Sequence, residues 1–140
     1  MKNLDNEKKR MEFFEALKGP SLEDTIAAYK RYCHPSIVWK NSGFPDIVGF
    51  DAVEHLLREQ KKLFDFERVK VLQHRLLASD GDHVFFERED TIVNSKDEVV
   101  FAFDILGVFE FEDGLIVRWA DYMDTTAVRE NWDKSSFDSL

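Results

Sequence analysis

The stretch Val84–Val93 constrains this chain most, because it places two opposite charges on a strand face that is otherwise apolar. It reads Val-Phe-Phe-Glu-Arg-Glu-Asp-Thr-Ile-Val between two turn-forming segments, a pattern typical of a β-strand. Side chains alternate between the two faces of a strand, so Arg88 and Asp90 lie on one face together. The other residues of that face are Val84, Phe86 and Ile92. A buried charge requires a partner, so the pattern predicts an ion pair that serves either the fold or a functional site.

Length, charge and cysteine content exclude several classes of protein. The 140 residues are expected to form one domain, and their 44% hydrophobic content is ordinary for a globular chain. The net charge of −9 argues against binding to nucleic acid or to an anionic membrane. The single cysteine, Cys33, excludes an internal disulfide. No apolar run approaches a membrane span or a signal peptide, so we expect a cytoplasmic protein whose partner is a small molecule.

The periodicity of the apolar residues predicts helices first and strands afterwards. Helices are expected over residues 3–18, 21–33 and 51–64. Strands are expected over residues 36–41, 67–78, 84–93, 99–111 and 115–123. This order favours an α+β fold in which N-terminal helices pack on a mostly antiparallel sheet. A single domain is expected over residues 1–140, with a polar, frayed tail over residues 131–140.

Local motifs make this prediction more specific. Ser21–Asp24 resembles a capping box at the start of the second helix, and Asp51 is expected to cap the third. Glu112–Gly114 predicts a hairpin between the last two strands. The first helix is expected to bury one apolar stripe, formed by Leu4, Met11, Phe14 and Leu17.

The strand over residues 99–111 is apolar on both faces near its middle. One face is almost wholly apolar, and the other carries Ala102, Leu106 and Val108 between acidic residues. Helices can cover only one side of the sheet, so the second side requires other cover. We therefore predict a homodimer that forms through the sheet.

Three expected strands carry a polar residue on an apolar face. These residues are the Arg88 and Asp90 pair, Asp121 between Trp119 and Met123, and Asn41 beside Trp39. A mostly apolar cavity with a few convergent polar groups is the usual form of a small-molecule site. Two carboxylates in such a cavity separate their pKa values, which suits one as a general base and the other as a general acid. A buried ion-pair network that only closes the sheet would show the same pattern.

Five motifs together resemble the limonene epoxide hydrolase family. They are Arg88-x-Asp90, Ile105–Phe109, Trp119–Asp124, Gly49–Glu54 and Trp39-x-Asn41, and the likeness covers residues 36–128. The resemblance implies the cone-shaped fold of nuclear transport factor 2 and the polyketide cyclases, in which helices and a curved sheet enclose a pocket. It also implies a dimer.

The resemblance further implies the catalytic roles. Asp121 would take a proton from water that Asn41 orients, Asp90 would protonate the epoxide oxygen, and Arg88 would bridge the two carboxylates. The product would be a vicinal diol, formed in a single displacement without a metal or an organic cofactor. Trp39 stands where the family has a tyrosine that helps to hold the water, and its indole offers one N–H donor and no acceptor.

The resemblance also implies the residues that line the substrate pocket. We also expect Trp119 to line this pocket, because it lies on the strand face that carries Asp121. The expected lining residues are Phe64, Phe66, Ile92, Phe103, Ile105, Trp119, Met123 and Val128. The abundance of phenylalanine favours a bulky apolar substrate.

Two other functions remain open from the sequence. A ketosteroid isomerase-like or polyketide cyclase-like enzyme would move a proton next to a carbonyl, which requires a donor for the enolate oxygen. No tyrosine is placed for that role, because Tyr122 alternates to the face opposite Asp121. A non-catalytic binding or interaction module would have Trp39 filling the pocket. No metal-ligand spacing is found, and His55, His74 and His83 are expected at the surface.

Overall fold

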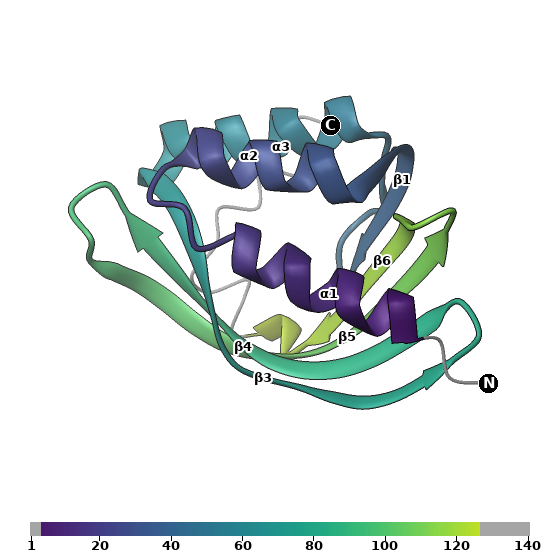
Figure 1. Ribbon diagram of the computed structural model, residues 1–140. Helices are drawn as coiled ribbons and strands as arrows, with labels where there is room; N and C mark the ends of the chain where they lie inside the picture. Colours follow the sequence, from purple (N-terminus) through teal and green to yellow (C-terminus); the bar gives the residue numbers. More distant parts are fainter. Residues whose placement is uncertain (1–3, 127–140) are drawn as a thin grey trace.

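Three helices and one six-stranded sheet make up the part of the chain that this computed structural model describes, residues 4–126 (Figure 1). The helices are α1 (Leu4–Ala16), α2 (Leu22–Tyr32) and α3 (Phe50–Phe64). The strands are β1 (Cys33–Asn41), β2 (Ile47–Val48), β3 (Phe66–Asp80), β4 (His83–Asn94), β5 (Val99–Glu112) and β6 (Leu115–Met123). The predicted tail over residues 131–140 and the predicted pocket residue Val128 lie outside the described residues. Within residues 4–126, none of the helices has the length and apolar character needed to span a membrane.

The sheet has the strand order β2-β1-β6-β5-β4-β3. Neighbouring strands are antiparallel except β1 and β6, which pair in parallel. The sheet is therefore mostly antiparallel, as predicted. The short strand β2, which lies in a stretch expected to be a loop, and the parallel pairing were not predicted.

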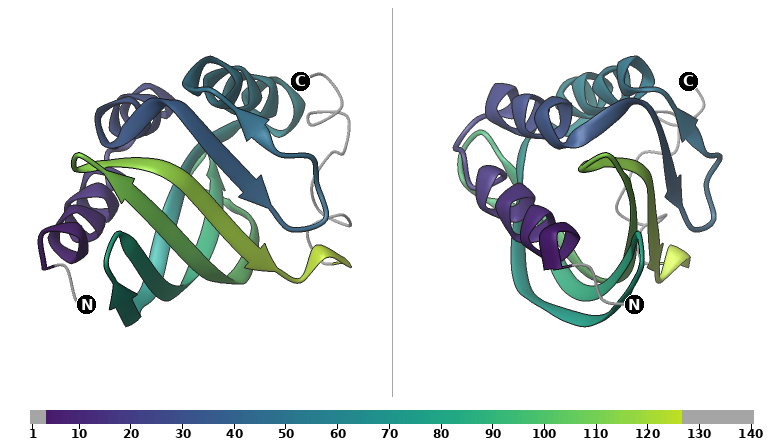
Figure 2. Two further views of the ribbon diagram at one scale, coloured as in Figure 1. Left: turned by 90° about the vertical axis from the view of Figure 1, so that its right-hand side faces the viewer. Right: turned by 45° about the vertical axis from the view of Figure 1, so that its right-hand side comes forward.

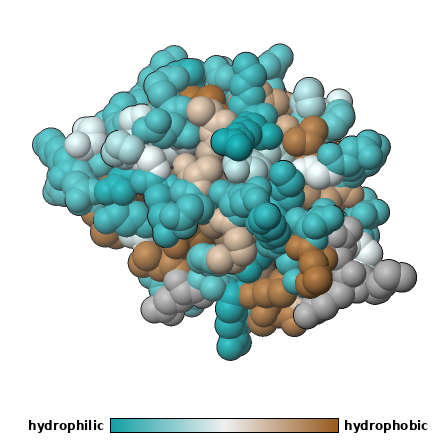
Figure 3. Space-filling model, in the orientation of Figure 1, coloured by the Kyte–Doolittle hydropathy of each residue, from teal (hydrophilic) through white to brown (hydrophobic). Residues whose placement is uncertain are grey.

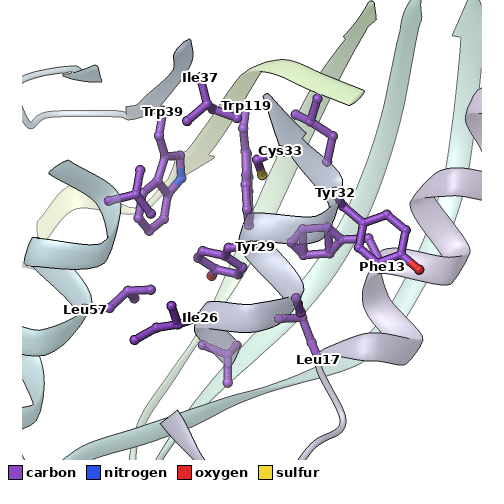
Figure 4. Close-up of a cluster of buried hydrophobic side chains, with 14 of the residues drawn as sticks. Phe13, Leu17, Ile26, Tyr29, Tyr32, Cys33, Ile37, Trp39, Leu57 and Trp119 are labelled. Atoms are coloured by element: carbon purple, nitrogen blue, oxygen red, sulfur yellow. The ribbon is translucent and has the colours of Figure 1, made fainter. Parts of the chain in front are cut away.

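The sheet curls into a partial barrel, and the three helices close its open side (Figures 1 and 2). The concave face and the helices bury one aromatic core, in which Phe13 from α1 contacts Tyr29, Phe109 and Trp119 at centroid separations of 5.3–5.8 Å. Figure 4 shows Phe13, Tyr29, Trp39 and Trp119 gathered in this space. The α+β cone that the sequence predicts is confirmed.

The predicted capping box is confirmed, whereas two other helix predictions are wrong in whole or in part. The Ser21 side chain accepts from the backbone N–H of Asp24 and the Asp24 carboxylate accepts from the backbone N–H of Ser21, each at 3.2 Å, which completes the capping box. Asp51 does not cap α3, because Gly49 is the N-cap residue and has no side chain to do so. Leu4 and Met11 are exposed by 68% and 48%. Helix α1 instead turns Phe13 and Phe14 inward, together with the polar residues Asn6 and Arg10.

The β5–β6 hairpin is confirmed, and its turn residues Asp113 and Gly114 both have positive φ, as a type I′ turn requires. One irregularity in β6 was missed. The register shifts between Glu110 and Phe111, so Val117 is an extra residue opposite β5 and forms a bulge. Strict alternation along β6 from Asp121 would turn Val117 and Leu115 inward. Because of the bulge, Ile116 faces inward instead and is fully buried.

Candidate active site

Arg88 and the carboxylates of Asp90 and Asp121 meet on the concave face of the sheet. Arg88 and Asp90 come from β4, and Asp121 comes from β6 on the other side of β5. Arg88 donates to both oxygens of Asp90, from Nε at 2.8 Å and from Nη2 at 3.2 Å. It also donates to both oxygens of Asp121, from Nη1 at 2.9 Å and from Nη2 at 2.7 Å. One guanidinium therefore holds both carboxylates by bidentate contacts, the strongest form of this pairing.

A glycine on the strand between them makes room for this arrangement. Gly107 of β5 pairs with Phe86 of β4 and with Asp121 of β6. A Cβ atom at this position would lie 2.6 Å from Cε2 of Phe86 and 2.7 Å from Nη1 of Arg88. Only a residue without a side chain lets the guanidinium cross β5 to reach Asp121.

The three charged residues are almost completely buried, at 3% exposure for Arg88, 8% for Asp90 and 2% for Asp121. Burial raises the pKa of Asp90, Arg88 opposes that shift, and the negative charge of Asp121 adds to it, so the net direction is upward. Burial disfavours the charge of Arg88, but Asp121 and Asp90 together hold its pKa above the ordinary value. The geometry thus favours a permanent cation between an aspartate that tends to keep its proton and a second aspartate.

Strand β1 brings Trp39 and Asn41 to the same place. The parallel register pairs Asn41 with Asp121 and Trp39 with Trp119, whose Nε1 donates to Asp121 at 2.8 Å. Trp39 Nε1 and Asn41 Nδ2 are buried, and neither atom has a hydrogen-bond partner among residues 4–126. Two donors without partners therefore lie next to the strand position of Asp121.

Asp90, Asp121, Trp39 and Asn41 line a small cavity of about 30 Å³. The five predicted catalytic residues are brought together, although Arg88 lies behind the two carboxylates and not in the lining. The predicted substrate residues in the lining are Phe66, Ile92, Phe103, Ile105, Trp119 and Met123. Phe64 is not in the lining; it packs beside Phe66 and Phe101 at centroid separations of 6.2 and 6.3 Å. Met123 and Phe103 are the lining side chains, among the described residues, that are only partly buried.

Four further residues in the lining were missed by the sequence analysis: Tyr29, Leu57, Gln60 and Val69. Tyr29 lies on α2 in an apolar helical stripe, which indicates core packing and conceals its position at the cavity. Burial raises the pKa of Tyr29, and the charge of Asp90 acts in the same direction, so the phenol stays protonated. Gln60 could have been identified from the sequence, since it is a polar residue on the apolar face of α3.

A larger open groove of about 990 Å³ involves β3 to β6 and is lined mainly by outer-face residues such as Glu87, Asp104 and Leu106. Neither Asp90 nor Asp121 is in its lining. The smaller cavity, which contains both carboxylates, is therefore the candidate site.

Residues 4–126 contain no cluster of three or more His, Cys, Asp or Glu side chains that could hold a metal ion. His74 was expected at the surface, but it is partly buried and contacts Arg10 and Phe14.

Residues 5–134 match the model of the limonene-1,2-epoxide hydrolase catalytic domain. The chain belongs to this family. The chain is 35% identical to epoxide hydrolase EphG of Mycobacterium tuberculosis over 112 residues. This alignment covers 80% of this chain and 68% of that protein. The resemblance to this family and the assignment to the epoxide hydrolase class of enzymes are confirmed.

Solved structures agree with this family assignment. A structure of an M. tuberculosis epoxide hydrolase of the limonene epoxide hydrolase type superposes with a TM-score of 0.65 at 25% identity, covering 91% of this chain and 89% of that one. A putative polyketide cyclase from Xanthomonas campestris superposes with a TM-score of 0.71 at 15% identity, covering 91% and 96%. The second likeness shows the fold alone, which is the nuclear transport factor 2-like cone.

Proposed function

We propose that this protein adds water to a largely apolar epoxide in one step and releases a vicinal diol. The observation that carries the proposal is the bidentate contact of Arg88 with both Asp90 and Asp121, whose side chains line a small, mainly apolar cavity. Family membership supports the reaction class, and the charge distribution supports the division of roles.

Asp121 is the proposed general base. The attacking water donates one hydrogen bond to the Asp121 carboxylate and the other to the side-chain oxygen of Asn41. It accepts one from the buried indole N–H of Trp39, so its second lone pair stays free to attack the epoxide carbon. As the water oxygen bonds to an epoxide carbon, Asp121 takes one of the water protons.

Asp90 is the proposed general acid. Its raised pKa favours the protonated carboxyl group, whose proton passes to the epoxide oxygen as the carbon–oxygen bond breaks. Arg88 holds both side chains in place and stays charged throughout. Each turnover leaves Asp121 protonated and Asp90 ionised, so one proton must return to Asp90 before the next cycle.

Substrate entry requires the cavity to widen. A volume of about 30 Å³ accommodates about one water molecule, whereas ligand pockets usually measure hundreds of cubic ångströms. Phe103 and Met123 are the partly buried side chains of the lining. We propose that rotation of these two side chains admits the epoxide beside the bound water.

A panel of apolar epoxides in ¹⁸O-labelled water tests the proposal. The wild-type protein should form diols with one labelled oxygen. Asp121→Asn should reduce diol formation by about 10²- to 10⁴-fold, since that is the usual contribution of a general base. The variant should keep its fold at reduced stability, because the asparagine oxygen still accepts from Arg88 while its amide nitrogen replaces the second acceptor. Asp46→Asn, which removes an exposed loop carboxylate, is the control. Full activity of Asp121→Asn would refute the assignment of the base.

One observation favours a second candidate, proton transfer next to a carbonyl as in isomerases and cyclases of this fold. Tyr29 lines the cavity and supplies the O–H donor that the sequence analysis did not find. A protonated phenol beside a neutral Asp90 could stabilise an enolate oxygen. Exchange of deuterium into a cyclic enone, measured by NMR, tests this candidate. Diol formation without deuterium exchange would leave epoxide hydrolysis as the only one of the two candidate functions.

A further inference from the structure

Gln60 interrupts the apolar face of helix α3. The neighbouring residues of that face are Val53, Leu56 and Leu57. They lie seven, four and three positions before Gln60 and are buried in the core. Gln60 is 2% exposed, and its Nε2 has no hydrogen-bond partner within residues 4–126. A buried amide donor without a partner destabilises a protein. We therefore expect Gln60 to have a hydrogen-bond partner that is not part of residues 4–126.

The catalytic water does not account for this donor. Trp39 and Asn41, which hold the water in the proposed mechanism, both come from β1 beside Asp121. One lone pair of the water must attack the epoxide carbon, so the water can accept only one hydrogen bond, and the indole N–H of Trp39 supplies it. Gln60 lines the same cavity from α3, in the helix layer, and remains without a role.

The cavity therefore has two sides of different chemistry. The sheet contributes the carboxylates of Asp90 and Asp121, which the reaction requires. The helices contribute Gln60 from α3 and the phenol of Tyr29 from α2. A substrate that reaches from the sheet to the helices meets polar groups at both ends and apolar side chains between them.

We propose, on the basis of the hydrolase function above, that Gln60 donates a hydrogen bond to an oxygen atom that the substrate carries away from its epoxide ring. The substrate class is then an epoxide with a largely apolar body and a remote hydroxyl, ether or carbonyl oxygen. Gln60 is a specificity-determining residue, because it contacts the bound molecule outside the reacting atoms.

Two matched epoxides test this inference. They are the epoxide of hexene and the same epoxide with a hydroxyl at the far end of its chain. The variant is Gln60→Met, which keeps the length of the side chain and removes both of its polar atoms. We expect kcat/KM for the hydroxylated epoxide to fall by about 3- to 10-fold, the usual value of one neutral hydrogen bond. The value for the plain epoxide should stay constant or rise.

Leu57→Met is the matched control on the same wall of the cavity, one turn earlier on α3. It changes the shape of the wall without changing its polarity, so both epoxides should respond to it alike. Parallel changes for both epoxides in Gln60→Met would overturn the inference.

Thermal unfolding separates recognition from a structural role. Gln60→Met should unfold at the wild-type temperature or above it, because the variant removes a buried donor without a partner. A marked fall in the unfolding temperature would show that Gln60 supports the fold, and it would overturn the inference. If the wild-type protein hydrolysed neither epoxide, the proposed function itself would fail. Hydrolysis of the plain epoxide with no discrimination by Gln60 would refute this inference alone.

Discussion

Arg88 shows why the identity of a single residue matters at this site. Its planar guanidinium contacts four carboxylate oxygens from three nitrogens, at 2.7 to 3.2 Å. A lysine ammonium is a point charge and could not bind two carboxylates in bidentate fashion. The guanidinium carbon also lies 5.5 Å from the ring centroid of Phe86 and 5.7 Å from that of Trp119, so these aromatic rings favour the cation. Asp90 and Asp121 are thereby held in fixed positions.

The raised pKa of Asp90 predicts the pH dependence of catalysis. As the proposed general acid, Asp90 would be active only while protonated, so kcat/KM should decline on the alkaline side as it loses its proton. The decline should occur above the ordinary aspartate pKa of about 3.9. A pH profile of kcat/KM measures it. A decline that follows the ordinary value would contradict the assignment.

The same shift predicts a pH-dependent stability. A folded-state pKa above the unfolded value stabilises the folded state at low pH, and this contribution is lost as pH rises through the folded-state pKa. Asp90→Asn mimics the protonated form and does not titrate. The unfolding temperature of the variant relative to the wild type should therefore increase with pH across this range. An unchanging difference would mean that the pKa of Asp90 is not raised.

Trp39 determines how much space the cavity provides. Its indole packs 5.3 Å from Trp119 and 6.0 Å from Tyr29 between ring centroids. Trp39→Tyr should raise kcat/KM for bulky epoxides, because a phenol is smaller and both donates and accepts hydrogen bonds. Trp39→Phe provides similar space without a polar group and should not reproduce the gain. Equal gains in the two variants would mean that volume alone limits the rate. No turnover in wild type or Trp39→Tyr would favour a non-catalytic module.

At the level of the elements, β5 controls the site without contributing a charged group to it. Gly107 separates Arg88 from Asp121 in the sheet and leaves the space that the guanidinium fills. The parallel register of β1 on β6 then sets Asn41 beside Asp121. The site therefore depends on strand register as much as on residue identity, because a shift of one residue reverses the face of every side chain.

Gly107→Ala tests the role of this strand. A methyl group at the position meets Phe86 and Arg88 well inside contact distance, so the variant should lose about 1–3 kcal/mol of unfolding free energy. Diol formation should fall as well, because the contact between Arg88 and Asp121 is displaced. Chemical denaturation and initial rates measure the two effects. Glu110→Ala, on the outer face of the same strand, is the control. Wild-type activity in Gly107→Ala would show that Arg88 tolerates the displacement.

At the level of the whole molecule, the described residues 4–126 leave the outer face of the sheet uncovered. Leu106 and Tyr122 are cross-strand neighbours there and are exposed by 44% and 42%. Seen from the side in Figure 3, the surface over the helices is mainly hydrophilic, and hydrophobic patches gather at the lower edge, where the sheet lies. Exposed apolar patches of this kind favour a partner. The predicted homodimer through the sheet stays a prediction.

Leu106→Glu tests this dimer. A charge at the centre of an apolar interface is costly to bury, so the variant should be monomeric where the wild type is dimeric. Light scattering after size-exclusion chromatography gives the two masses. Leu63→Glu, at a leucine exposed by 42% on α3, is the matched control and should leave the mass unchanged. A monomeric wild type would refute the prediction.

Local pattern was enough to predict the order of the elements, the hairpin at Glu112–Gly114 and the burial of Arg88, Asp90 and Asp121. These features depend on periodicity, on turn chemistry and on the need of a buried charge for a partner, all of which can be read within a few residues. The resemblance to a family then supplied the closed cone and the roles of the residues.

Tertiary contacts decided the remainder. The inward face of α1 depends on which side meets the sheet, so Phe13 is buried while Leu4 and Met11 are exposed. Tyr29 looks like a core position in the sequence, and only the curl of the sheet against α2 makes it a lining residue. Periodicity determines which residues share a face, but the face that meets a cavity is set by packing between elements that are distant in sequence.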